Sequence, residues 1–314
     1  MNIVVTPRSF SSTSNKPKDI LESKSDNIDY NNTGKPYSQD EMIEKISDCD
    51  GIIVGIDPLN EKILEHANNL KVISKYGVGT DNIDIKYCKN KDIVVTNTPN
   101  ANNKAVADLA FGLILNLARR INEADRKTRA GEWGKIIGDA VNNKTLGIVG
   151  LGKIGKEVAK RASGFDMKIL VYDVVKDNEF KEKYNVEYVS LDNLLINSDF
   201  VSIHTPLNEK TRDLITINEL NKMKRSAYLV NTSRGGIINE EDLYKALKDY
   251  IIKGAALDAF VKEPPKNSPL KKLDNIIMTS HMGAYTIEAI EKMGVHAVNN
   301  LVDVLEGRTP ENKL

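Results

Sequence analysis

The sequence of 314 residues predicts an α/β protein with two doubly wound parallel sheets. Two observations predict this fold class. Short apolar runs of strand length alternate with amphipathic stretches of helix length, which is typical of parallel strands covered by helices. That alternation breaks once, at Asn97-Thr-Pro-Asn-Ala-Asn102, where we expect the chain to cross between domains. A chain of this length has room for two separate cores.

The first 98 residues predict strands at 3–5, 51–54, 71–73 and 93–95, with helices at 40–47 and 61–68. The segment 9–35 is rich in Ser, Asn, Lys and Asp and only weakly periodic, so a surface loop or a ragged helix is expected there. The next helix, about 104–120, is apolar on nearly every side. It must be covered all round, either between domains or at a subunit contact.

From Lys144 onward the pattern predicts a second α/β unit. Its strands are expected at 146–149, 168–172, 200–203, 227–230, 254–257 and 276–278, with helices that include 240–248 and 286–305. Each strand ends on a small polar motif. Ligands of open parallel sheets bind beyond the carboxyl ends of the strands, so these motifs are expected to converge on one crevice. The final helix is expected to return to the first domain.

Composition excludes several classes of function. The 44 basic residues balance the 44 acidic ones, so no bulk charge attracts nucleic acid or an anionic membrane. No apolar run is long enough to span a bilayer, and the N-terminus lacks the apolar region of a signal peptide. Cys49 and Cys88 are isolated, and no His, Asp or Glu cluster has metal spacing. We therefore expect a cytoplasmic protein with reduced thiols and no metal site.

A glycine-rich turn gives the first functional signal. The apolar strand 146–149 runs into Gly150-x-Gly152-x-x-Gly155, and an amphipathic helix follows. In a Rossmann-like unit, such glycines allow a tight turn and let the backbone approach a pyrophosphate at the helix N-terminus. Asp173 ends the next strand about 20 residues later, where a ribose-binding acid is expected. Val174 and Val175 follow it rather than an arginine, so the pattern predicts a dinucleotide site that prefers NAD to NADP.

Three charged residues leave the later loops: Arg234, Glu263 and His281. Reduction of a 2-keto acid by hydride transfer needs a proton donor, a carboxylate that orients it, and a planar cation that grips the substrate carboxylate. Spacing alone leaves other interpretations open, namely a structural histidine, an arginine in a salt bridge and a solvated loop acid. His204 and His296 are competing histidines; His204 is better placed to line a cofactor, and His296 lies within a helix.

Several motifs in the same order carry a family resemblance. They are Lys75-Tyr-Gly-Val-Gly-Thr-Asp-Asn-Ile-Asp84, Gly147 to Gly155, His204-Thr-Pro-Leu, Asn231-Thr-Ser-Arg-Gly-Gly236, Ala256-Leu-Asp-Ala-Phe260 with Glu263-Pro, and Ser280-His-Met-Gly-Ala284. On these motifs the chain resembles the D-isomer-specific 2-hydroxyacid dehydrogenase family, and within it short forms of D-3-phosphoglycerate dehydrogenase. The similarity extends from about Lys71 to Arg308.

The resemblance implies roles for individual residues. His281 would be the acid/base, Glu263 its partner and Arg234 the substrate clamp. The implied substrate-binding residues are Lys75, Tyr76, Gly77, Val78 and Gly79. The implied cofactor-binding residues are Gly150, Gly152, Lys153, Ile154, Gly155, Asp173, His204, Thr205, Pro206, Thr211, Asn231, Thr232, Ser233, Asp258 and Gly283.

The resemblance also implies an arrangement of domains and subunits. A flavodoxin-like substrate domain would comprise 1–98 and 285–314, and an inserted NAD-binding Rossmann domain would comprise 99–284. Relatives are usually dimers joined through the cofactor domain, so a homodimer is expected. Trp133, the single tryptophan, is either a surface-packed aromatic residue or an anchor in that interface.

Departures from the family pattern bear on the substrate. Relatives specific for phosphoglycerate carry arginines where this chain has Gly55 and Lys75, and Tyr76 stands where a small residue is common. The substrate is therefore either 3-phosphoglycerate and phosphohydroxypyruvate, in serine biosynthesis, or an unphosphorylated acid such as hydroxypyruvate or glyoxylate. Glu263 argues against formate dehydrogenases, which carry glutamine there. An alternative of another class is an NAD(H)-sensing protein of the corepressor type, although no basic face for DNA is evident.

Overall fold

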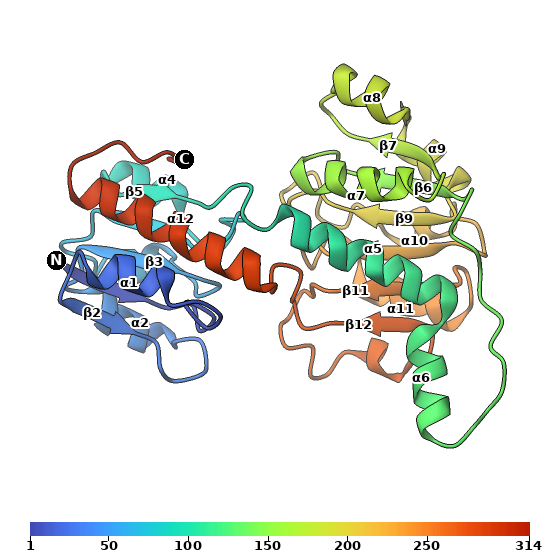
Figure 1. The fold of residues 1–314 in the computed structure, drawn as a ribbon, viewed down its shortest axis with the longest axis horizontal. Coiled ribbons are helices and arrows are strands. Elements are labelled where there is room, and N and C mark those ends of the chain that lie inside the picture. The colour runs from blue at the N-terminus through green and yellow to red at the C-terminus, as the bar shows by residue number, and fades with distance from the viewer. The chain divides into compact units, whose positions relative to one another are not determined.

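The computed structural model describes all 314 residues and divides the chain into two compact units. Unit 1 combines residues 1–102 with 284–314, and unit 2 is the continuous stretch 103–283. Each unit contains one parallel sheet with helices on both of its faces (Figure 1). The predicted fold class is therefore confirmed. None of the helices combines the length and the apolar character needed to cross a membrane.

The sheet of unit 1 has five parallel strands in the order β2-β1-β3-β4-β5. The strands are β1 Asn2–Val5, β2 Asn27–Tyr30, β3 Gly51–Val54, β4 Val72–Lys75 and β5 Val94–Thr96. The helices are α1 Lys16–Glu22, α2 Gln39–Ile46, α3 Glu61–Leu64, α4 Ile85–Asn90 and α12 Ile287–Leu305. Side chains alternate between the faces of the sheet. Ile3 and Val5 lie in one apolar cluster with α1 and α12, whereas Val4 lies in the other with α2, α3 and α4.

The segment 9–35 contains both α1 and β2, so the expectation of a loop or ragged helix missed a strand. β2 is an edge strand that pairs only with β1. Its four residues, Asn27-Ile-Asp-Tyr30, include none that is fully buried. An edge strand of this kind needs no apolar run, and its sequence therefore resembles that of a surface loop.

The sheet of unit 2 has seven parallel strands in the order β12-β11-β10-β9-β6-β7-β8. The strands are β6 Thr145–Val149, β7 Lys168–Tyr172, β8 Val186–Tyr188, β9 Phe200–Ile203, β10 Tyr228–Asn231, β11 Gly254–Leu257 and β12 Ile276–Met278. The helices are α5 Asn103–Arg119, α6 Ile121–Arg129, α7 Lys153–Ser163, α8 Asn178–Tyr184, α9 Leu191–Asn197, α10 Ile217–Leu220 and α11 Glu240–Lys248. Residues of α5 and α7 form the apolar cluster on one face, and residues of α9, α10 and α11 contribute to the cluster on the other.

In the middle of β6, at Gly147, the sheet packs closely against the segment that covers it. A Cβ atom on Gly147 would lie 2.4 Å from Leu194 Cδ2 of α9 and 2.4 Å from the Oγ of Ser198, the residue that follows this helix. We expect Gly147→Ala to lower the free energy of unfolding by ~1–3 kcal/mol, because the helix must shift to admit a methyl group. The measurement is urea unfolding followed by circular dichroism.

Gly112 in α5 provides the matched control. A Cβ atom there meets nothing within 4 Å, so Gly112→Ala should raise the free energy of unfolding by ~0.5–1 kcal/mol through helix propensity alone. Equal effects of the two substitutions would contradict the packing argument.

Candidate functional site

The strand ends of unit 2 form one row because the strands are paired in register. Val149 of β6 pairs with Tyr172 of β7 and Ile203 of β9. The row continues through Asn231, Leu257 and Met278 of β10, β11 and β12. The residues that follow each strand are therefore neighbours along the carboxyl edge of the sheet, where open α/β sheets bind their ligands.

The turn after β6 requires glycine at two points. Gly150 has φ +95°, a left-handed conformation that side chains disfavour. A Cβ atom on Gly155 would lie 2.2 Å from the carbonyl oxygen of Gly150, so only glycine lets α7 approach the turn this closely. α7 begins directly after Gly152, and its first residues are Lys153 and Ile154. The unpaired N–H groups at this helix end provide an anion site suited to a pyrophosphate.

Asp173 follows β7 and ties that strand to the glycine turn. Its Oδ2 accepts a hydrogen bond of 2.6 Å from the Leu151 N–H, and its Oδ1 accepts one of 2.8 Å from the Val175 N–H. A carboxylate fixed beside the phosphate turn is suited to accept hydrogen bonds from the hydroxyls of a ribose.

The loop after β9 begins with a buried histidine. His204 Nε2 lies 2.8 Å from Ser202 Oγ, whereas its Nδ1 is buried without a partner. Burial lowers the pKa of His204 to about 3, so its imidazole is neutral at physiological pH. Thr205 and Pro206 follow, and Thr211 Oγ1 donates to the Pro206 carbonyl oxygen at 2.6 Å, which closes the turn.

The loop after β10 is folded by its own side chains. Asn231 Oδ1 accepts hydrogen bonds from the N–H and the hydroxyl of Ser233, and its Nδ2 donates to the Arg234 carbonyl oxygen at 2.8 Å. A Cβ atom on Gly235 would lie 2.0 Å from the carbonyl carbon of Phe260, so this loop lies directly against the one after β11. Thr232 Oγ1 is buried without a partner.

Asp258, at the end of β11, fixes the turn that carries His281. Its side chain is buried, its Oδ1 accepts from Thr279 Oγ1 at 2.6 Å and from the Met282 N–H at 2.8 Å, and its Oδ2 accepts from the Gly283 N–H at 2.8 Å. His281, held between these contacts, has φ +54°. A non-glycine residue in this region is uncommon and is found where the surrounding structure imposes it.

His281 Nδ1 lies 2.9 Å from both carboxylate oxygens of Glu263. Burial alone would raise the pKa of Glu263. The hydrogen bond and the charge of His281, the Phe260 N–H and the charge of Arg234 all lower it. The second effect is larger, so the pKa of Glu263 lies below its usual range. Glu263 is therefore ionised at neutral pH and accepts the Nδ1 proton of His281. Proton gain and loss are then left to His281 Nε2.

In unit 1, the residues around Lys75 form a buried polar cluster. Lys75 Nζ donates to the Gly55 carbonyl oxygen at 2.5 Å and to Asn82 Oδ1 at 2.7 Å. Asn82 Nδ2 donates in turn to the Asp57 carbonyl oxygen at 2.6 Å. The ammonium group of Lys75 thus joins the loop after β3 to the loop after β4. Sequence reasoning assigned no role to Asn82 or Asp57, although Asn82 lies within the motif Lys75 to Asp84 and Asp57 follows a strand.

Tyr76 and the glycines after it have separate surroundings. The Tyr76 hydroxyl donates to the Ile290 carbonyl oxygen of α12 at 3.1 Å, and its side chain is buried. The Gly77 N–H donates to Thr98 Oγ1 at 3.0 Å, and Asn97 Nδ2 donates to the Val78 carbonyl oxygen at 3.0 Å. The loop from Gly77 to Gly79 is therefore held by the residues that follow β5.

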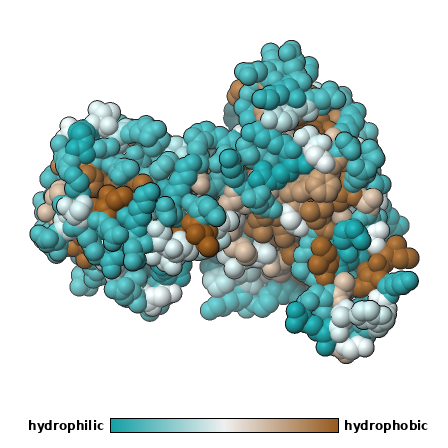
Figure 2. All heavy atoms as spheres, viewed as in Figure 1, coloured by the Kyte–Doolittle hydropathy of each residue, from teal (hydrophilic) through white to brown (hydrophobic).

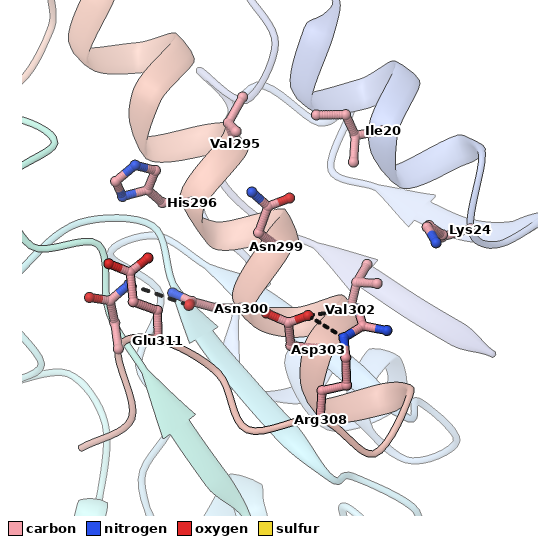
Figure 3. Close-up of a pocket in the computed structure, with 11 residues that line it drawn as sticks. Ile20, Lys24, Val295, His296, Asn299, Asn300, Val302, Asp303, Arg308 and Glu311 are labelled. Carbon is pink, nitrogen blue, oxygen red and sulfur yellow. Dashed lines mark hydrogen bonds and ion pairs between the residues drawn. The ribbon is translucent and has the colours of Figure 1, made fainter.

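The competing histidine His296 has a different environment. It lines a pocket between α1, α12 and the C-terminal tail (Figure 3). Its Nδ1 is buried without a hydrogen-bond partner, and burial lowers its pKa. It therefore lacks the hydrogen-bonded carboxylate that orients His281.

Comparison with known proteins gives consistent matches. Residues 111–283 match the family model described as D-isomer specific 2-hydroxyacid dehydrogenase, NAD binding domain. A glyoxylate reductase from Korarchaeum cryptofilum is 43% identical over 285 residues, which are 88% of this chain and 86% of that protein. A D-3-phosphoglycerate dehydrogenase from Methanocaldococcus jannaschii is 42% identical over 88% of this chain and 53% of that protein.

A solved structure gives the same result for the fold. D-lactate dehydrogenase from Aquifex aeolicus, complexed with NAD and lactic acid, matches with a TM-score of 0.87 at 30% identity, over 100% of this chain and 99% of that one. The family model covers more than half of the chain, and the glyoxylate reductase is similar over most of its length. The chain therefore belongs to the D-isomer specific 2-hydroxyacid dehydrogenases and is an NAD-dependent oxidoreductase.

Proposed function

We propose that this protein reduces a short 2-keto acid to the D-2-hydroxy acid, with unit 2 as the cofactor domain and unit 1 as the substrate domain. The observation that carries the proposal is the pair His281–Glu263, with Arg234 close enough to lower the pKa of Glu263. A proton donor, an orienting carboxylate and a planar cation are the groups that this reduction requires.

The carboxyl edge of unit 2 fits NAD(H). The turn at Gly150 and Gly155 admits only backbone, and Asp173 stands beside it with both oxygens fixed. Further along the edge, His204 Nδ1 and Thr232 Oγ1 are buried polar atoms without partners, and hydrogen bonds to a bound dinucleotide would satisfy them. The cofactor supplies the hydride. The implied cofactor-binding residues of the loops after β6, β7, β9, β10 and β11 would hold it.

The protein's own groups would then stabilise the developing charge, donate the proton and bind the substrate carboxylate. Hydride addition to C2 leaves negative charge on the carbonyl oxygen, and His281 Nε2 would donate the proton that completes the hydroxyl group. Glu263 would orient the imidazole through Nδ1. Arg234 would bind the substrate carboxylate with two parallel hydrogen bonds and polarise the adjacent carbonyl. The loop from Gly77 to Gly79 would belong to the substrate-binding residues of unit 1.

Glyoxylate and hydroxypyruvate are the substrates we propose first. Lys75, the cation expected to meet a phosphate, is buried and donates to Gly55 and Asn82 within unit 1. The similar glyoxylate reductase supports the same choice. Phosphohydroxypyruvate, and with it a role in serine biosynthesis, is the second candidate, supported by the similar phosphoglycerate dehydrogenase. The test is NADH oxidation with each acid; a chain that binds NADH but reduces none of them would overturn the proposal.

We further propose a homodimer joined through the cofactor domain. The segment after α6 carries Trp133, 90% exposed, and Ile137, 88% exposed. Its base is rigid, because Asp139 accepts hydrogen bonds from the Tyr228 hydroxyl and from Lys253 Nζ. Figure 2 shows apolar residues gathered on the surface over the neighbouring α5. Apolar side chains on a fixed support are suited to contact a second copy of the chain.

We also propose a cytoplasmic location. The buried free thiols of Cys49 and Cys88 fit a reducing compartment such as the cytoplasm.

The acid/base role of His281 gives the first prediction from the proposed function. His281→Ala should lower kcat by at least ~10³-fold, since no other group is placed to donate the proton. NADH affinity, measured by fluorescence titration, should change less than about threefold because the cofactor is held by other residues. A large loss of NADH affinity would contradict the role assigned to His281.

The second prediction concerns cofactor choice. Asp173→Ala removes the carboxylate that would accept ribose hydroxyls and repel a 2′-phosphate. We expect the affinity for NADH to fall by ~10-fold or more while that for NADPH falls less or rises. The measurement is the dissociation constant of each cofactor. Equal weakening of both would mean that Asp173 does not read the ribose.

The third prediction concerns the dimer. Replacing both Trp133 and Ile137 with Ser should convert a dimer into a monomer, because the apolar area lost lies at the proposed interface. The readout is mass from light scattering during gel filtration. Tyr250→Ser, at a residue that is 61% exposed elsewhere in unit 2, is the control and should leave the dimer intact. A monomeric wild-type protein would refute the interface.

A further inference from the structure

Glu240 joins two loops of unit 2 through a contact that the proposed function does not use. It is the first residue of α11 and is half-buried. Its Oε1 accepts a hydrogen bond of 2.6 Å from the Val261 N–H, in the loop after β11. The helix does not need Glu240 as a cap, because the side chain of Asn239 already accepts a hydrogen bond from the Asp242 N–H. The carboxylate of Glu240 is thus directed at a neighbouring loop rather than at its own helix.

The backbone that Glu240 holds is also the backbone that holds Glu263. The Phe260 N–H, one residue before Val261, donates to Glu263 Oε1 at 3.0 Å. Glu263 in turn has both carboxylate oxygens 2.9 Å from His281 Nδ1. The side chain of Val261 is 66% exposed, so its packing does little to fix this stretch of backbone. Successive polar contacts therefore connect the start of α11 with the imidazole.

The same stretch of backbone lies against the loop that carries Arg234. A Cβ atom on Gly235 would lie 2.0 Å from the Phe260 carbonyl carbon and 2.3 Å from the Val261 nitrogen. Glu240 follows Gly235 in the same connection, from β10 to α11. The loop after β10 is therefore held against the loop after β11 at two points, by close backbone packing at Gly235 and by the hydrogen bond of Glu240.

We propose that Glu240 is a positioning residue that fixes Glu263, and through it His281, relative to the loop of Arg234. The inference rests on the proposed function, in which these groups act on one substrate. Misplacement of reacting groups by about 1 Å can lower a rate by ~10²-fold. A carboxylate suits this task because its hydrogen bond to a backbone N–H is stronger than that of a neutral acceptor.

The alternative is that Glu240 acts only as a negative charge at the start of α11. The first turn of this helix carries three acidic residues, Glu240, Glu241 and Asp242, and the helix dipole favours all of them. Glu241 is exposed and makes no hydrogen bond or ion pair. It has the same charge in the same turn without the contact to the neighbouring loop, and it therefore provides the matched control.

The experiment separates the contact from the charge. Glu240→Asp keeps the charge but shortens the side chain by one C–C bond, about 1.5 Å, which breaks the hydrogen bond to the Val261 N–H. Glu240→Gln keeps an acceptor oxygen at full length without the charge. With glyoxylate or hydroxypyruvate, Glu240→Asp should lower kcat/KM by ~10–100-fold, whereas Glu240→Gln should stay within ~5-fold of the wild type. Glu241→Asp should leave kcat/KM unchanged, and none of the three variants should change the dissociation constant of NADH.

A second readout needs no turnover. Nitrogen-15 NMR of histidine-labelled protein reports which ring nitrogen of His281 carries the proton, and the chain has only 4 histidines to assign. In the wild type the proton should lie on Nδ1, facing Glu263. Glu240→Asp should give a mixture of both tautomers, and Glu240→Gln should not. A residue that only stabilised the fold would leave the tautomer unchanged in the folded variant.

The outcomes are distinct. Wild-type kcat/KM and an unchanged tautomer in Glu240→Asp would overturn the positioning role. An active Glu240→Asp together with an inactive Glu240→Gln would also overturn it, because charge at the helix start rather than the contact would then matter. A wild-type protein that binds NADH but reduces no acid would overturn the proposed function, and the tautomer of His281 would still decide the role of Glu240.

Discussion

The register of the parallel ladder in unit 2 is the constraint on which the candidate site depends. Pairing aligns Tyr172, Val149, Ile203, Asn231 and Leu257 across five neighbouring strands. The next residue on each strand is therefore placed at the same edge, about 4.8 Å from its neighbour. A shift of one residue in any strand would exchange the buried and the exposed faces of that strand and move its loop out of the row. Packing of the core thus sets the spacing of the polar groups.

Within that row, buried polar contacts fix the directions of side chains, which strand pairing does not determine. A strand end fixes where a loop begins, but it does not fix the direction of a side chain three residues later. Asp258 fixes the turn that carries His281, because its two oxygens accept hydrogen bonds from residues on both sides of the histidine. Glu263 then orients the ring through Nδ1. Each contact is local, and together they leave the imidazole with a single nitrogen able to exchange protons.

The sequence predicted the fold class, the family and the cofactor, because each depends on patterns that are local in the chain. Apolar runs mark buried strands, and glycine spacing marks a turn where backbone meets helix. β2 was missed because an edge strand that is half exposed carries no such run. The cluster of Lys75, Asn82 and Asp57 was missed for another reason: its contacts join residues up to 25 positions apart, and only the folded sheet brings them together.

The burial of Lys75 changes how the substrate domain should be understood. A lysine in a substrate-binding motif suggests a group that touches the ligand. Here its ammonium is used to join two loops, in a site where an unpaired charge would be costly. The cluster therefore supports the backbone on both sides of the loop from Gly77 to Gly79, which we propose as part of the substrate site. A side chain that the core holds in this way is not free to adapt to different ligands.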